Sequence, residues 1–97
     1  MKNRFDISAF VNVLTVQTAM ENLAQRFRKR RKEKKLSQKR IAQQSGVSYA
    51  SVRRFESSGR ISLHSLMELA RVLGCLEDFN ELFKTPVISD LEDYDDD

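Results

Sequence analysis

The spacing of apolar positions after residue 17 predicts a series of helices. Thr18-Ala-Met-Glu21 has the form of a capping box, in which the threonine accepts a bond from the backbone and the glutamate reaches back. The first helix is therefore expected to start at Thr18, and its sequence becomes almost entirely basic towards Lys35, before Leu36 closes the segment. Its apolar positions are Met20, Leu23, Ala24 and Phe27.

Four more helices are expected, and most are bounded by a capping serine and a terminating glycine. The capping serines are Ser37, Ser48 and Ser62, and the glycines are Gly46, Gly59 and Gly74. The expected helices are Gln38–Gln44, Tyr49–Ser57, a helix capped by Ser62 that continues to Leu73, and a short helix at about Leu76–Phe83. Connections this short predict a compact, all-α five-helix bundle.

Leucines and phenylalanines at helical spacing in the last two helices are expected in the core, although part of them could instead form a dimer seam. These residues are Leu66, Leu69, Leu73, Phe79, Leu82 and Phe83.

Three parts of the chain are distinguished by composition: an N-terminal extension (1–17), the helical domain (18–84) and an acidic tail (85–97). Residues 5–16 are rich in apolar side chains and fit either a strand or a helix, with a slight preference for a short helix after Ser8. The tail is expected to be disordered, because it follows Pro86, is acidic and lacks periodicity.

Composition narrows the class of protein. The chain has 97 residues, enough for one small domain, and 3 Gly and 1 Pro, too few for the many turns of a sandwich or barrel. One Cys and one His cannot supply a four-ligand zinc site or a disulfide, so no metal or cofactor is expected. Without a recognisable signal or membrane segment, a cytoplasmic protein is expected.

The net charge of +3 conceals a strong asymmetry. Residues 1–89 contain 17 basic and eight acidic residues, a net charge of +9, whereas the last eight residues carry −6. Ten basic residues lie within Arg26–Arg40. This concentration is typical of a protein that binds a polyanion, although a basic run can also be a solvated helix face.

Residues 38–57 match a helix-turn-helix unit. Ala42 provides the small residue where two helices cross, and Gly46 provides the tight turn between them. The inward apolar positions are Ile41, Val47, Val52 and Phe55. The second helix of such a unit enters the major groove of DNA.

At about 100° per residue, Val52 and Phe55 fall on one side of that helix and a polar set falls on the other. Arginine recognises guanine, tyrosine and alanine can contact the thymine methyl group, and serine bonds to bases or phosphates. The residues expected to contact bases are Ser48, Tyr49, Ala50, Arg53 and Arg54.

The stretch LSQKRIAQQSGVSYASVRRFESSG resembles the helix-turn-helix of the Cro and lambdoid phage repressor class, the XRE family, and the resemblance extends over about Leu23–Leu73. It implies a structural ion pair between Arg31 and Glu56, and a phosphate contact by Gln38. The residues expected to contact phosphates are Gln38, Lys39, Gln44, Ser51 and Ser57.

The expected function is therefore a dimeric repressor that binds an inverted repeat in double-stranded DNA. The segment GRISLHSLMELARVLGCLEDFNELF also resembles HipB-type antitoxins, which implies an alternative: an antitoxin that neutralises a HipA-type toxin kinase and regulates its own operon. Without a phosphate loop or a histidine-based constellation, an enzyme is not expected.

Overall fold

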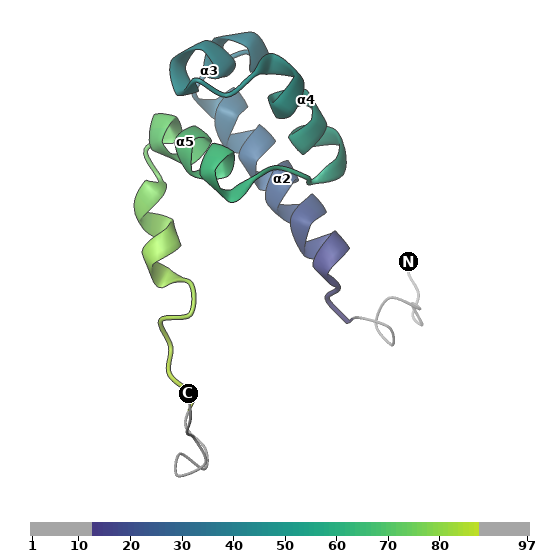
Figure 1. Cartoon of the computed structure of the whole chain (residues 1–97), viewed down its shortest axis with the longest axis vertical. Coiled ribbons are helices and arrows are strands. Elements are labelled where there is room, and N and C mark those ends of the chain that lie inside the picture. The colour runs from purple at the N-terminus through teal and green to yellow at the C-terminus, as the bar shows by residue number, and fades with distance from the viewer. Residues whose placement is uncertain (1–12, 88–97) are drawn as a thin grey trace.

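The computed structural model describes residues 13–87 and is built of helices throughout that range (Figure 1). In chain order these are α2 (Val16–Glu33), α3 (Gln38–Ser45), α4 (Tyr49–Ser58), α5 (Leu63–Leu73) and a 3-10 helix, η1 (Leu76–Glu81). The all-helical fold class with five helices is confirmed. Helix α4 packs against α2, α3 packs against α4 and α5, and η1 leads away from the bundle after α5 (Figure 1).

The helix boundaries follow the local chemistry of serine and glycine. The side chains of Ser37, Ser48 and Ser62 accept bonds from backbone N–H groups at the starts of α3, α4 and α5, as predicted. Glycines with positive φ end the same three helices, which is why L-residues with a Cβ are disfavoured there.

The predicted N-cap of the first helix is wrong by three residues. Thr15, not Thr18, is the N-cap, and α2 begins at Val16. The Thr15 hydroxyl accepts from the Thr18 backbone N–H at 3.1 Å, and the Thr18 hydroxyl accepts from the Thr15 backbone N–H at 3.0 Å. Thr18 thus takes the place that glutamate has in the predicted box, and Glu21 instead accepts from Gln17.

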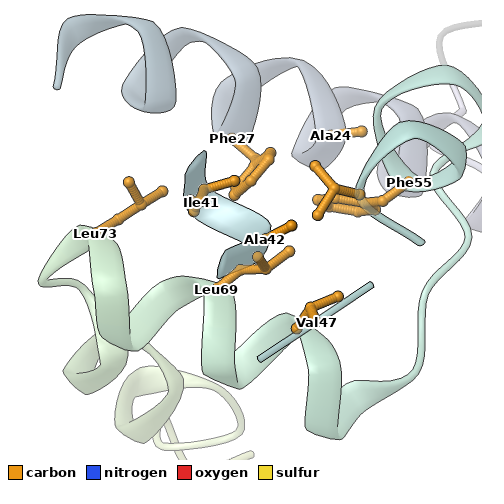
Figure 2. Packing of buried hydrophobic residues seen from close by; sticks show 9 residues of the cluster. Ala24, Phe27, Ile41, Ala42, Val47, Phe55, Leu69 and Leu73 are labelled. Carbon is orange, nitrogen blue, oxygen red and sulfur yellow. The ribbon is translucent and has the colours of Figure 1, made fainter. Parts of the chain in front are cut away.

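The core is a single cluster at the centre of the four α-helices. Figure 2 shows its side chains converging from every α-helix and from the turn before α4. Its most buried members are Ala24, Ile41, Val52, Phe55 and Leu69. Phe27 of α2 lies against Phe55 of α4, with ring centroids 5.3 Å apart, and so ties α4 to the longest helix.

The last predicted helix differs from the structure in type and in burial. It is a 3-10 helix that ends at Glu81, and Leu82 and Phe83 lie outside the core, with Phe83 93% exposed. Phe83 has a positive φ of 66°, which is incompatible with continuing a right-handed helix. Leu69 and Leu73 are buried as expected, whereas Leu66 and Phe79 are half-buried.

Residues 5–12 and the last ten residues, including most of the acidic tail, lie outside the described residues. Val13 and Leu14 are exposed and precede the helix, so a short helix after Ser8 does not extend through them.

Candidate nucleic-acid interface

Helix α4 has two chemically different faces. Val52 and Phe55 are buried in the core, as the helical spacing predicted. The opposite face is exposed to solvent and carries two guanidinium groups. Its residues are Tyr49, Ala50, Arg53, Arg54 and Ser57. The helix therefore presents polar, hydrogen-bonding side chains on a rigid support.

Both ends of α4 are anchored. At its start, the Ser48 hydroxyl accepts from the Ser51 backbone N–H at 3.1 Å and lies 2.8 Å from the Ser51 hydroxyl. At its end, the Gln17 side chain donates to the Ser58 carbonyl oxygen at 3.1 Å, and Gly59 packs directly against the backbone of α2. These contacts fix the direction in which the exposed face points.

A buried ion pair joins α2 to α4. Arg31 donates from Nε to Glu56 Oε2 at 2.6 Å and from Nη2 to Glu56 Oε1 at 3.0 Å. The two side chains are 7% and 5% exposed, so both charges are largely removed from water. Arg31 Nη1 also donates to the Leu36 carbonyl oxygen at 2.8 Å, which fixes the link between α2 and α3.

Gln38 extends this network to the start of α3. Its Nε2 donates to Glu56 Oε1 at 2.9 Å, so one carboxylate is shared by side chains from α2 and α3. Because Gln38 is the first residue of α3, the network fixes the relative placement of all three helices at one point.

Tyr49 lies between two cations. Lys39 Nζ is 5.5 Å from the centroid of its ring, and the guanidinium carbon of Arg53 is 5.6 Å from it. Cations at this distance are attracted to the ring face. Tyr49 thus links the start of α3 to the exposed face of α4 and orients one of the arginines there.

An open groove of about 830 Å³ lies between the last half of α2, the start of α3 and the outer face of α4. Nine residues line it: Arg28, Arg31, Ser37, Gln38, Ala50, Arg53, Arg54, Glu56 and Ser57. Four are arginines and one is acidic, so the groove has a net positive charge. Its shape and charge suit an extended anion.

Five of the predicted contact residues meet in this groove: Gln38, Ala50, Arg53, Arg54 and Ser57. The other five do not line it: Lys39, Gln44, Ser48, Tyr49 and Ser51. Of these, Tyr49 contacts Arg53 of the groove, and Lys39 contacts Tyr49. Arg28 lines the groove although it was not among the predicted contact residues. Its position three residues before Arg31, which places both side chains on the same side of a helix, is the sequence signal that could have identified it.

The described range contains no group of three or more His, Cys, Asp or Glu side chains that could hold a metal ion. Between residues 13 and 87, no helix is long and apolar enough to cross a membrane.

Comparison with known proteins gives one match. A family model described as helix-turn-helix matches residues 27–79, more than half of the chain. No curated protein and no solved structure matches the chain. The matched range begins in the last part of α2 and ends within η1, so it includes all nine residues that line the groove.

Proposed function

Since the chain belongs to the helix-turn-helix family, it is a DNA-binding regulator, and we propose that it is a repressor that binds an inverted repeat as a homodimer. The observation that carries the proposal is the exposed basic face of α4 on a helix whose other face is buried in the core. The XRE-family resemblance of the sequence is supported by the same match.

In this proposal α4 is the recognition helix and lies in the major groove, which is about 12 Å wide. Arg53 and Arg54 donate to guanine O6 and N7, and Tyr49 and Ala50 contact thymine methyl groups, with Ser48 as a further base contact. Gln38, Lys39, Gln44, Ser51 and Ser57 hold the backbone phosphates. The exposed positions of the two arginines support this assignment.

Two physical arguments support a dimer that blocks transcription. One helix with a few outward side chains reads a short half-site, and a second copy doubles the length of DNA that is specified. In such dimers the half-sites lie about 34 Å apart, one turn of the double helix. A dimer bound over a promoter occupies the surface that RNA polymerase needs.

Selection of duplexes from a random pool, followed by footprinting, tests the proposal. We expect an enriched inverted repeat with protection centred on it, and footprinting of the DNA upstream of its own gene tests for autoregulation. Enrichment of no motif would refute sequence-specific binding, and enrichment of a single half-site would refute the dimer.

Substitutions separate base contacts from phosphate contacts. Arg54→Ala is expected to cost about 1–3 kcal/mol on the selected duplex and to relax the preference at one base position. Lys39→Ala should weaken binding to all sequences alike. If both variants give the same sequence profile, the assignment of roles is wrong.

A second candidate is the antitoxin, favoured by the exposed apolar side chains of Leu76, Leu82 and Phe83 beyond α5. A HipA-type kinase encoded beside this gene would be expected to co-purify with the chain and lose activity in the complex. The two functions are compatible in one chain, because the apolar residues do not belong to the groove at α4.

A further inference from the structure

The groove beside α4 holds more positive charge than its own contacts neutralise. Four arginines line it: Arg28 and Arg31 from α2, and Arg53 and Arg54 from α4. The sole carboxylate among the residues that line it is Glu56. One ion pair therefore leaves three guanidinium charges in the groove.

The two arginines of α2 differ in how firmly they are held. Arg31 donates three hydrogen bonds within the protein and is 7% exposed, so its guanidinium has a structural role and is not available for a ligand. Arg28 approaches Glu56 at 3.9 Å, has a side chain that is 58% exposed, and makes no hydrogen bond in the described range. A contact of this length, made by a side chain that lies mostly in solvent, holds Arg28 only weakly, so its guanidinium is available for a ligand.

We propose that Arg28 is a phosphate-binding residue, and that the DNA strand bordering the major groove occupied by α4 runs through this groove between α2 and α4. The inference rests on the proposed function and adds α2 to the interface. Glu56 does not repel the strand, because Arg31 and Gln38 already satisfy its carboxylate.

Phosphate, rather than a base edge, is the ligand that the location of Arg28 favours. Arg28 lines the groove from α2, whereas Ala50, Arg53 and Arg54 line it from α4, the helix proposed to enter the major groove. A guanidinium can donate two parallel N–H bonds to a phosphate, and that charge-assisted pair is stronger than the 3.9 Å contact with Glu56.

The test measures how DNA affinity depends on salt concentration for the full chain. Log affinity falls with log salt by about 0.9 for each phosphate that the protein neutralises. Arg28→Ala is therefore expected to reduce this slope by about 0.9 per bound protomer. As salt falls from about 200 to about 50 mM, the affinity deficit of Arg28→Ala relative to the unaltered chain should grow about 3.5-fold per protomer, on selected and scrambled duplexes alike.

Arg26→Ala is the matched control. Arg26 is also an exposed arginine of α2, two residues earlier and therefore turned about 200° away, and it does not line the groove. Arg26→Ala removes the same charge as Arg28→Ala, but because Arg26 does not line the groove, the slope should equal that of the unaltered chain. Arg28→Lys keeps the charge and is expected to keep the slope. Circular dichroism melting confirms that each variant is folded.

The outcomes are distinguishable. If the unaltered chain binds a selected duplex while Arg28→Ala leaves the slope unchanged, or lowers it no more than Arg26→Ala, the role of Arg28 is refuted and the proposed function stands. If Arg28→Ala changes the base preference instead of the slope, Arg28 contacts a base and the phosphate assignment is wrong. If the unaltered chain binds no duplex, both proposals fail.

Discussion

Removing either partner of the ion pair between Arg31 and Glu56 is expected to destabilise this small domain strongly. Arg31→Met removes the guanidinium but keeps a long side chain, and it leaves the Glu56 carboxylate 5% exposed with Gln38 as its remaining hydrogen-bond donor. Leaving one charge of a buried pair without its partner costs about 3–5 kcal/mol.

The structure places the expected loss for Arg31→Met at the lower end of that range, about 3 kcal/mol. Arg28 lies 3.9 Å from Glu56 with a side chain that is 58% exposed, so a small rotamer change can bring its guanidinium closer and restore part of the charge balance. In Glu56→Met no neighbouring side chain can compensate the unpaired charge in this way, because the guanidinium of Arg31 is left buried among other arginines. We expect the larger loss for Glu56→Met.

Urea unfolding followed by circular dichroism at the helix band measures both losses, since the described fold is helical. The double variant Arg31→Met with Glu56→Met should be less destabilised than the sum of the two single variants, by about 2 kcal/mol or more, because neither charge is then left alone. For a domain of this size, a loss of about 3 kcal/mol lowers the melting temperature by about 12 °C or more.

Two results would refute this reasoning. Single variants that each lose less than about 1 kcal/mol would show that the pair behaves like an exposed one. Strictly additive losses in the double variant would show that the two side chains do not interact in solution.

Three further substitutions test other features. Gly59→Ala should cost about 1–3 kcal/mol more than Gly46→Ala, because both glycines have nearly the same positive φ of about 80° but a Cβ at Gly59 would meet the backbone of α2 at 2.8 Å. Leu69→Ala should cost about 2–5 kcal/mol by thermal or urea unfolding, and Leu63→Ala, which is exposed, less than about 0.5 kcal/mol. Truncation after Ser89 should raise DNA affinity most at low salt, because a tethered charge of −6 competes with phosphates for the basic groove, and should leave the melting temperature nearly unchanged.

Equal losses of stability in Gly59→Ala and Gly46→Ala would mean that α2 shifts away from the added Cβ at no cost in free energy. Equal losses for the two leucines would mean that the central cluster is not what stabilises the fold. An affinity that truncation leaves unchanged at both low and high salt would mean that the tail does not compete with DNA, and that its charge serves solubility or a protein partner.

Most helix boundaries could be predicted because the signals for them are local. A serine whose side chain bonds to the backbone three residues later, and a glycine that accepts a positive φ, act within a few residues of chain. Ser48 and Gly59 bound α4 for this reason. The burial of Val52 and Phe55 followed from helical periodicity, because opposite faces of one helix meet different surroundings.

The predictions differ from the structure where two local signals compete for one helix start, or where tertiary contacts determine the outcome. Thr15 and Thr18 are both followed three residues later by a polar partner, and the more familiar pairing with glutamate favoured the wrong one. The spacing of Leu82 and Phe83 suits a helix, but η1 packs mainly against α5, and both side chains are exposed. Continuing the helix would therefore bury little apolar surface. Arg28 resembles its basic neighbours in sequence, and it is the packing of α2 beside α4 that distinguishes it.

The division of α4 into a buried face and an exposed face separates two kinds of evolutionary constraint. Substitutions at Ala50, Arg53 and Arg54 leave Val52 and Phe55 in place, and changes at exposed positions usually alter stability by less than about 0.5 kcal/mol. If α4 reads DNA as proposed, regulators on this scaffold can acquire new target sequences one substitution at a time while remaining folded. Exchanging these outward side chains for those of a related regulator should then transfer that regulator's target sequence to this chain.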